Sequence, residues 1–138
     1  MASWCNLLPD YVPVVESDSR RIVVNQKLKK AQDKVDRKDK MQIHHWMKYW
    51  VEDGPENIPA EKFKYQQKFS RNGFRPVTLF VFKSHQARYY GFTREYLGKT
   101  TFFVTAIDPD KKDHKADPEM LGRASNEAFR VLGELKIQ

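Results

Sequence analysis

Two cationic residues that flank a short turn are the strongest chemical signal in the sequence. Lys83 ends one apolar segment and Arg88 begins the next, with only the residues SHQA between them. If the two segments form a β-hairpin, the cationic groups lie close together, and clustered unpaired cations are typical of a site for an anion. We expect Arg88 to stabilise a pentacoordinate phosphorus transition state and Lys83 to hold the same phosphate. The alternative is a solvated edge of a sheet that binds nothing.

A second group of ionisable residues precedes the C-terminal helical segment. It consists of Lys111, Lys112, His114 and Lys115. An imidazole with a pKa near ~6.5 can exchange a proton with a ribose hydroxyl or a leaving oxygen without a metal ion. We therefore expect His114 and Lys112 to be catalytic and Lys111 and Lys115 to contact phosphate. The alternative is an exposed polar loop, since four nearby Asp residues cancel the local charge.

Basic and aromatic residues alternate between positions 54 and 76. Within this segment, Lys62, Lys64 and Lys68 alternate with Phe63, Tyr65 and Phe69. Such interleaving suits single-stranded RNA, although an amphipathic connection gives the same pattern. Tyr89 and Tyr90 are adjacent and should face opposite sides of a strand. Either one of them stacks on a base while the other packs in the core, or both belong to the core.

The sequence gives no indication of a metal site or of a cofactor. Cys5 is the only cysteine, which excludes an intrachain disulfide and a thiolate-rich metal site. His44 and His45 are neighbours on a predicted helix, about 100° apart, so joint chelation of a metal is awkward. We expect chemistry that needs neither a metal ion nor a cofactor.

Positive charge is concentrated in one stretch of the chain. The formal charge is +7, and Arg20 to Lys40 contains nine Lys or Arg against three Asp, a net +6. Such a stretch attracts polyanions, of which phosphate backbones are the commonest inside cells. A solvated helical face is the alternative.

The length of 138 residues favours a single domain. Residues 1–19 are expected to form a flexible lead-in or edge segment, because Pro9 and Pro13 interrupt their apolar residues. The domain proper is expected at 20–138. No apolar run approaches the ~18 residues that cross a bilayer, and the N-terminus lacks the order of a secretory signal. We expect a cytoplasmic protein without a membrane partner.

Local signals predict a strand followed by two helices in the first half. The β-branched residues 22–24 suit a short strand, and Asn25 offers an N-cap for a helix that contains residues 28–35. A continuous helix from Arg20 is the alternative. Asp36 is the predicted N-cap of a second helix, which buries a Trp-rich face and stops at Gly54.

The second half predicts three strands and a helix. Val77–Lys83, Arg88–Thr93 and Thr100–Ile107 are rich in β-branched and aromatic residues and should form an antiparallel meander. Asp117 is the expected N-cap of the last helix. The expected fold is therefore α+β, with a small antiparallel sheet of about four strands, two N-terminal helices and a C-terminal helix.

Seven short motifs follow one another in a recognisable order. They are Gly54-Pro55, Lys62-Phe63-Lys64, Phe80-Val81-Phe82-Lys83, Arg88-Tyr89-Tyr90-Gly91-Phe92, Phe102-Phe103-Val104-Thr105-Ala106, Lys111-Lys112-Asp113-His114-Lys115 and Arg123-Ala124. In this order the chain resembles the HigB-like, phage-derived branch of the RelE/ParE toxin superfamily. No single motif is specific, but together they span more than half of the chain.

The resemblance implies a RelE-like domain and the function of a type II toxin. It implies metal-independent cleavage of messenger RNA on the ribosome, which inhibits translation, and an antitoxin that covers a basic cleft, expected to be a helix-turn-helix DNA-binding protein. The superfamily also contains non-catalytic members, so a ParE-like DNA gyrase inhibitor or a phage-derived nucleic-acid-binding protein is the alternative. Lys83, Arg88 and the cluster at 111–115 favour the nuclease, because an inhibitor of gyrase need not gather cations around one phosphate.

Overall fold

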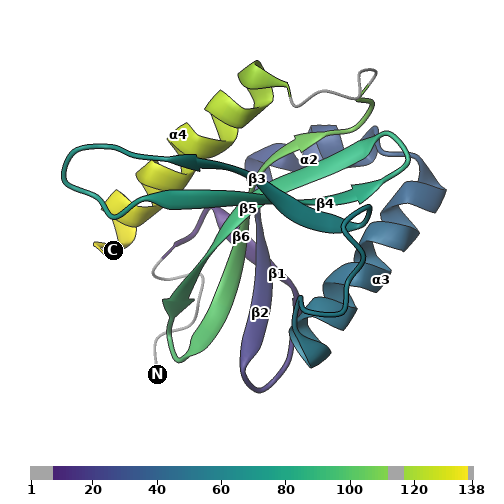
Figure 1. Ribbon diagram of the computed structural model, residues 1–138, viewed down its shortest axis with the longest axis horizontal. Coiled ribbons are helices and arrows are strands. Elements are labelled where there is room, and N and C mark those ends of the chain that lie inside the picture. The colour runs from purple at the N-terminus through teal and green to yellow at the C-terminus, as the bar shows by residue number, and fades with distance from the viewer. Residues whose placement is uncertain (1–7, 112–116, 137–138) are drawn as a thin grey trace.

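A six-stranded sheet forms the centre of the molecule (Figure 1). The structure is a computed structural model, and it describes residues 8–111 and 117–136. The strand order is β1-β2-β6-β5-β4-β3, and only the pairing of β2 with β6 is parallel. The strands are β1 (Tyr11–Glu16), β2 (Arg20–Asn25), β3 (Phe63–Phe69), β4 (Val77–Ser84), β5 (Ala87–Tyr96) and β6 (Lys99–Asp108). The fold is α+β with a mixed sheet, so the α+β part of the expectation is confirmed.

Helices cover both faces of this sheet. They are the 3-10 helix η1 (Gln26–Leu28), the short helix α2 (Lys29–Asp33), α3 (Arg37–Asp53) and α4 (Pro118–Leu135). α4 packs on one face and α3 with α2 on the other (Figure 1). We call these the α4 face and the α3 face. Alternate residues of β6 enter different cores, with Phe103 under α4 and Phe102 under α3.

The predicted ends of the two long helices are confirmed. The Asp36 carboxylate accepts a hydrogen bond from the Lys38 amide, and Asp117 does the same for the amide of Glu119. α3 stops at Gly54, whose φ of 87° suits glycine and whose amide donates to the Trp50 carbonyl. The side-chain and backbone signals at these ends are local, which is why the sequence could place them.

The expectation of about four antiparallel strands with two N-terminal helices is wrong, because the sheet is mixed and has six strands. The basic, aromatic segment after Gly54 is an edge strand, β3, and a further edge strand, β1, precedes β2. Asn25 does act as an N-cap, but it caps η1, and the continuation is a five-residue helix. The alternative of one helix from Arg20 is also wrong, because residues 20–25 are β2.

The described part of the predicted lead-in, from residue 8 onward, belongs to the sheet. A polar cluster joins β1 and β2 to α4: the Tyr11 hydroxyl and the Asn25 amide both donate to Oε2 of Glu127, at 2.7 and 2.8 Å. Arg130 donates to both oxygens of the same carboxylate and lies 3.3 Å from Asp10. Of the two expectations for this segment, an edge segment is confirmed for β1, and a flexible lead-in is wrong for it, since β1 is fastened to the core.

No helix in the two described ranges combines the length and the apolar character that a bilayer crossing requires. The longest, α4, is amphipathic and buries one side against the sheet.

Candidate anion-binding site

Three cationic side chains form a row across neighbouring strands, and we call Lys64, Lys83 and Arg88 the cationic row. Lys83 and Arg88 are direct partners in the β4–β5 hairpin, so their side chains leave the same face of the sheet. Lys64 of β3 pairs with Val81, which lies two residues before Lys83 and packs in the core under α4. All three cations therefore lie on the α4 face, at the end of the sheet near the β4–β5 turn.

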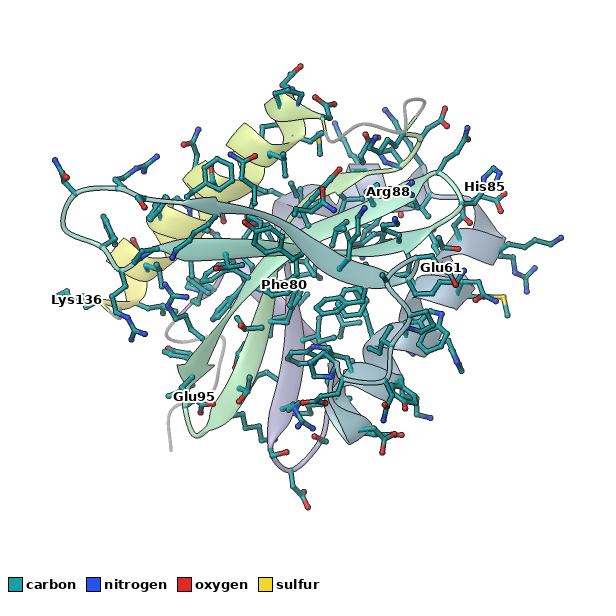
Figure 2. The ribbon with its side chains drawn as sticks, in the orientation of Figure 1. Glu61, Phe80, His85, Arg88, Glu95 and Lys136 are labelled. Atoms are coloured by element: carbon teal, nitrogen blue, oxygen red, sulfur yellow. The ribbon has the colours of Figure 1, made fainter. Side chains whose placement is uncertain are left out.

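The hairpin brings these residues together because its turn is only two residues long. Ser84 pairs with Ala87, which leaves His85 and Gln86 to reverse the chain, and His85 adopts a φ of 49°. Figure 2 shows Arg88 beside this turn and His85 at its tip. The expected closeness of Lys83 and Arg88 is confirmed.

The environment of Lys83 lowers the pKa of its ammonium group. Partial burial is the main cause, followed by the charges of Lys64 and Arg88, while Glu61 acts in the opposite direction. Lys83 therefore releases a proton more easily than an exposed lysine. A bound anion would relieve the repulsion that causes part of this shift.

Arg88 is held against the turn by one of its terminal nitrogens. Its Nη1 donates to the carbonyls of His85 and Ala87, at 2.7 and 2.9 Å. Burial lowers the pKa of its guanidinium, and Tyr90, Asp108 and Asp39 oppose the shift. A guanidinium stays protonated at any physiological pH, so Arg88 carries its charge throughout.

The carboxylates near the row do not form ion pairs with it. Asp108 of β6 is the direct partner of Arg88 across the sheet. Within residues 8–111 and 117–136, however, none of the ion pairs shorter than 4 Å involves Lys64, Lys83 or Arg88. Asp108 and Asp39 act on Arg88, and Glu61 acts on Lys83, only through longer-range attraction, so the three cations have no ion-pair partner at contact distance in the described part of the chain.

Asp108 was missed as a member of this site by sequence reasoning. Counting back from the β5–β6 turn, where Tyr96 pairs with Lys99, would place Ile107 opposite Arg88. A bulge at Thr105 of β6, which is unpaired between the partners of Tyr90 and Gly91, shifts the register by one residue and brings Asp108 there instead. No signal in the sequence marks the position of that bulge unambiguously.

The two tyrosines of β5 face opposite sides of the sheet, as expected. Tyr90 lies on the α4 face beside the row, and Tyr89 lies on the α3 face. Their exposed fractions are 1% and 4%, so both belong to the core and neither ring is open for base stacking. Burial raises the pKa of Tyr90 to about 12, with a further contribution from Asp108, and its hydroxyl stays protonated.

The remaining predicted residues separate into three groups. Lys68 pairs with Thr78 and projects from the α3 face, away from the row, because a bulge in β3 changes the alternation. Lys62 is adjacent to the row through its backbone, since its carbonyl accepts from the Lys83 amide at 2.8 Å. Lys111 is mostly buried, and its amide donates to the Gln86 carbonyl of the β4–β5 turn at 2.8 Å. Lys112, His114 and Lys115 lie outside the described residues.

A hollow of about 710 Å³ lies on the α3 side of the same turn. It carries both charge signs, and its charged lining residues are Lys34, Asp36, Lys38, Asp39 and Asp110. Asp39 is buried and accepts a hydrogen bond from Ser84 at 3.0 Å. Because positive and negative side chains both line this hollow, it suits a phosphate less well than the cationic row does.

In the portion of the chain that the structure describes, no three His, Cys, Asp or Glu side chains are placed to hold a metal ion. His44 and His45 are exposed on α3, on the face opposite to the cationic row.

Comparisons with protein-family models, with curated proteins and with solved structures each found no match. The function is therefore inferred from the residues of this chain and from their arrangement.

Proposed function

We propose that the protein binds RNA through the cationic row and cleaves it without a metal ion, as a RelE-like type II toxin that acts on messenger RNA at the ribosome. The observation that carries the proposal is the row itself. Lys64, Lys83 and Arg88 leave one face of three neighbouring strands, and no carboxylate in the described ranges forms an ion pair with them. The order of the seven sequence motifs is the reason for proposing a function within the RelE/ParE toxin superfamily.

The proposed reaction uses the 2′-hydroxyl of RNA as the nucleophile. Its oxygen attacks the adjacent phosphorus and the bond from phosphorus to the 5′-oxygen breaks, which leaves a 2′,3′-cyclic phosphate and a 5′-hydroxyl. The phosphorane gains negative charge on its oxygens, and Arg88 and Lys83 stabilise that charge. His114 takes the proton of the 2′-hydroxyl, and Lys83 or Lys112 returns one to the leaving oxygen.

The lowered pKa of Lys83 supports its role as a proton donor. A lysine with an ordinary pKa holds its proton too firmly to transfer it efficiently at neutral pH. Lys62, Lys64 and Lys115 would contact the flanking phosphates, outside the scissile bond, whereas the burial of Lys111 argues against such a contact for it. The burial of both tyrosines leaves them no part in base stacking.

A protein partner would be needed to neutralise this surface while the toxin is inactive. The proposed partner is a cognate antitoxin, a helix-turn-helix DNA-binding protein, and the proposed compartment is the cytoplasm. The net +6 of residues 20–40 would add long-range attraction toward the ribosome, because charge of one sign raises association rates.

A non-catalytic member of the superfamily is the second candidate, either a ParE-like gyrase inhibitor or a phage-derived nucleic-acid-binding protein. The two bonds from Arg88 to carbonyls of the turn favour it, since an arginine that braces a hairpin has a structural role without any substrate.

The test is translation in a reconstituted extract, followed by mapping of message ends. We expect the wild-type protein to produce ends with a 5′-hydroxyl, and Lys83→Gln and Arg88→Ala to lose at least 100-fold in rate. Lys68→Gln is the matched control, because it removes one positive charge from the opposite face. Intact messages with the wild-type protein would refute the nuclease, and DNA damage signalling on expression in cells would point to gyrase.

A further inference from the structure

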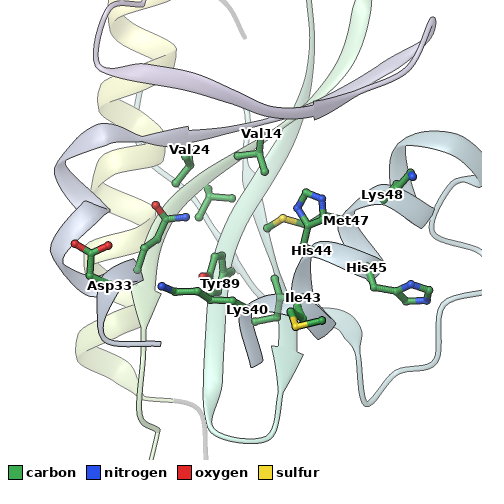
Figure 3. Close-up of a pocket in the computed structure, with 13 residues that line it drawn as sticks. Val14, Val24, Asp33, Lys40, Ile43, His44, His45, Met47, Lys48 and Tyr89 are labelled. Atoms are coloured by element: carbon green, nitrogen blue, oxygen red, sulfur yellow. The ribbon is translucent and has the colours of Figure 1, made fainter. Parts of the chain in front are cut away.

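A second hollow lies on the α3 face, on the side of the sheet opposite to the cationic row. It has a volume of about 680 Å³ and opens between α2, α3 and the sheet (Figure 3). Its floor comes from three central strands, with Val24 of β2, Tyr89 of β5 and Val104 of β6. Its size lies within the ~300–1,000 Å³ that is usual for sites of small molecules.

The interior of this pocket is apolar and is not filled by the chain's own side chains. Ile43 and Met47 of α3 project into it, and half-buried Val14 of β1 closes its upper end in Figure 3. Protein interiors are normally packed as closely as organic crystals, so an apolar hollow of this size forfeits dispersion contacts. A hydrocarbon group in the hollow would make such contacts with Val14 and Met41, the apolar lining residues that are not buried.

The rim of the pocket is cationic on the α3 side. Lys40, His44 and Lys48 are spaced by four residues and therefore form one stripe along the helix. Lys40 is half-buried and extends from α3 toward α2 over Tyr89, and His44 lies beside Met47 (Figure 3). Asp33 of α2 is the single carboxylate of the lining, and no ion pair joins it to Lys40 within 4 Å among the described residues.

We propose that this pocket binds a small amphiphilic carboxylate, with its hydrocarbon chain against Val14 and Met41, over the buried floor, and its carboxylate at Lys40 and His44. The apolar floor requires an apolar chain, and the net positive rim selects an anionic head over a neutral or cationic one. A charge-assisted hydrogen bond from a half-buried ammonium is stronger than one in open solvent. This site is separate from the cationic row and does not depend on the proposed nuclease activity.

The first experiment is isothermal titration calorimetry of the full chain with three probes that share a ten-carbon chain. They are decanoate, decanol and decyltrimethylammonium. We expect decanoate to bind at least tenfold more tightly than the other two. Equal binding of all three, or no binding of decanoate below 1 mM, on the order of the weakest specific affinities, would overturn the proposal.

Variants then locate the site. Val14→Trp fills the upper end of the pocket and should abolish decanoate binding, and Lys40→Met should weaken it about tenfold by removing the charged partner. Asp33→Asn should tighten it about threefold, because the carboxylate beside the head group is neutralised. Lys38→Met on the same helix is the matched control, and Lys83→Gln should also leave the affinity unchanged.

Two outcomes would contradict this assignment. Decanoate binding that survives both Val14→Trp and Lys40→Met would place the ligand elsewhere. Binding of an acidic amphipathic peptide that Val14→Trp abolishes, without binding of decanoate, would mean that the pocket receives a protein segment. Lys40→Met removes only a rim side chain, so it tests the proposal even if Val14→Trp unfolds.

Discussion

The polar cluster around Glu127 makes β1 a part of the folding unit, and Tyr11→Phe tests its contribution. Tyr11 is fully buried, and its hydroxyl donates to the Glu127 carboxylate at 2.7 Å. Burial and the charge of Glu127 raise the pKa of Tyr11 well above its ordinary range, so the phenol remains a donor at every accessible pH. The substitution removes one oxygen and leaves the ring in place.

The expected loss of stability in Tyr11→Phe follows from the charge on the acceptor of this hydrogen bond. A hydrogen bond to a charged group contributes about 1.5–3 kcal/mol, and Glu127 keeps its bonds from Asn25 and Arg130 in the variant. We therefore expect Tyr11→Phe to lower the free energy of unfolding by about 2 kcal/mol at pH 7. For a chain of this size, that corresponds to a fall of roughly 6–8 °C in Tm.

The effect should depend on pH in a defined direction. Burial alone would raise the pKa of Glu127, but the bonds from Arg130, Tyr11 and Asn25 outweigh it and hold the pKa below its ordinary 4.5. The resulting stability is fully present above pH 4.5 and is lost as the pH falls through the folded-state pKa. Below that value Tyr11 meets a neutral carboxyl, and the cost of Tyr11→Phe should shrink to about 1 kcal/mol.

Urea unfolding between pH 3 and pH 7 measures this, with the wild type, Tyr11→Phe, Glu127→Gln and the double variant. In the Glu127→Gln background, the cost of Tyr11→Phe should stay near 1 kcal/mol at both ends of this range. A cost below about 0.5 kcal/mol at pH 7 would show that β1 is not fastened in this way. A cost of about 2 kcal/mol for Tyr11→Phe that persists in the Glu127→Gln background would refute the role of the Glu127 charge.

Two further predictions concern the backbone of the β5–β6 hairpin. In Gly91→Ala the new Cβ would overlap the Phe103 carbonyl oxygen and lie 2.5 Å from the Phe102 ring, so we expect the free energy of unfolding in urea to fall by about 3 kcal/mol or more. An unchanged midpoint would mean that β5 and β6 do not approach so closely. Leu97 is exposed and has a φ of 50°, which Asn tolerates better, so Leu97→Asn should raise the free energy of unfolding by about 1 kcal/mol. A lower Tm in calorimetry would contradict this reading of the turn.

The parts of the fold that could be predicted are those with local causes. Asp36 and Asp117 cap their helices through bonds to amides two residues away, and Gly54 ends α3 through its own backbone. The closeness of Lys83 and Arg88 also has a local cause, because a two-residue turn fixes the register of the hairpin.

The parts that were missed depend on distant residues. β3 is polar at most of its positions and contains a bulge, so its sequence lacks the alternation of a half-buried strand. β1 contains Pro13, which an edge strand tolerates, and its main anchor is a carboxylate 116 residues away. The parallel pairing of β2 with β6 joins segments that are far apart in the chain.

The candidate site was predicted in part for the same reason. The register of the β4–β5 hairpin predicted the pairing of Lys83 with Arg88, while the placement of Lys64, Lys68 and Asp108 depends on bulges in β3 and β6. A single bulge moves every following side chain to the other face, and the sequence marks its position weakly.

The salt dependence of RNA binding tests most directly whether Lys64, Lys83 and Arg88 act as one anion site. The affinity for a single-stranded RNA is measured from 50 to 200 mM salt for the wild type and for Lys64→Gln, Lys83→Gln and Lys68→Gln. Each lost phosphate contact should reduce the slope of log K against log salt by ~0.7 for the two variants in the row, and Lys68→Gln should leave it unchanged. Equal slopes for all four proteins, or an equal reduction in all three variants, would contradict a site formed by the row.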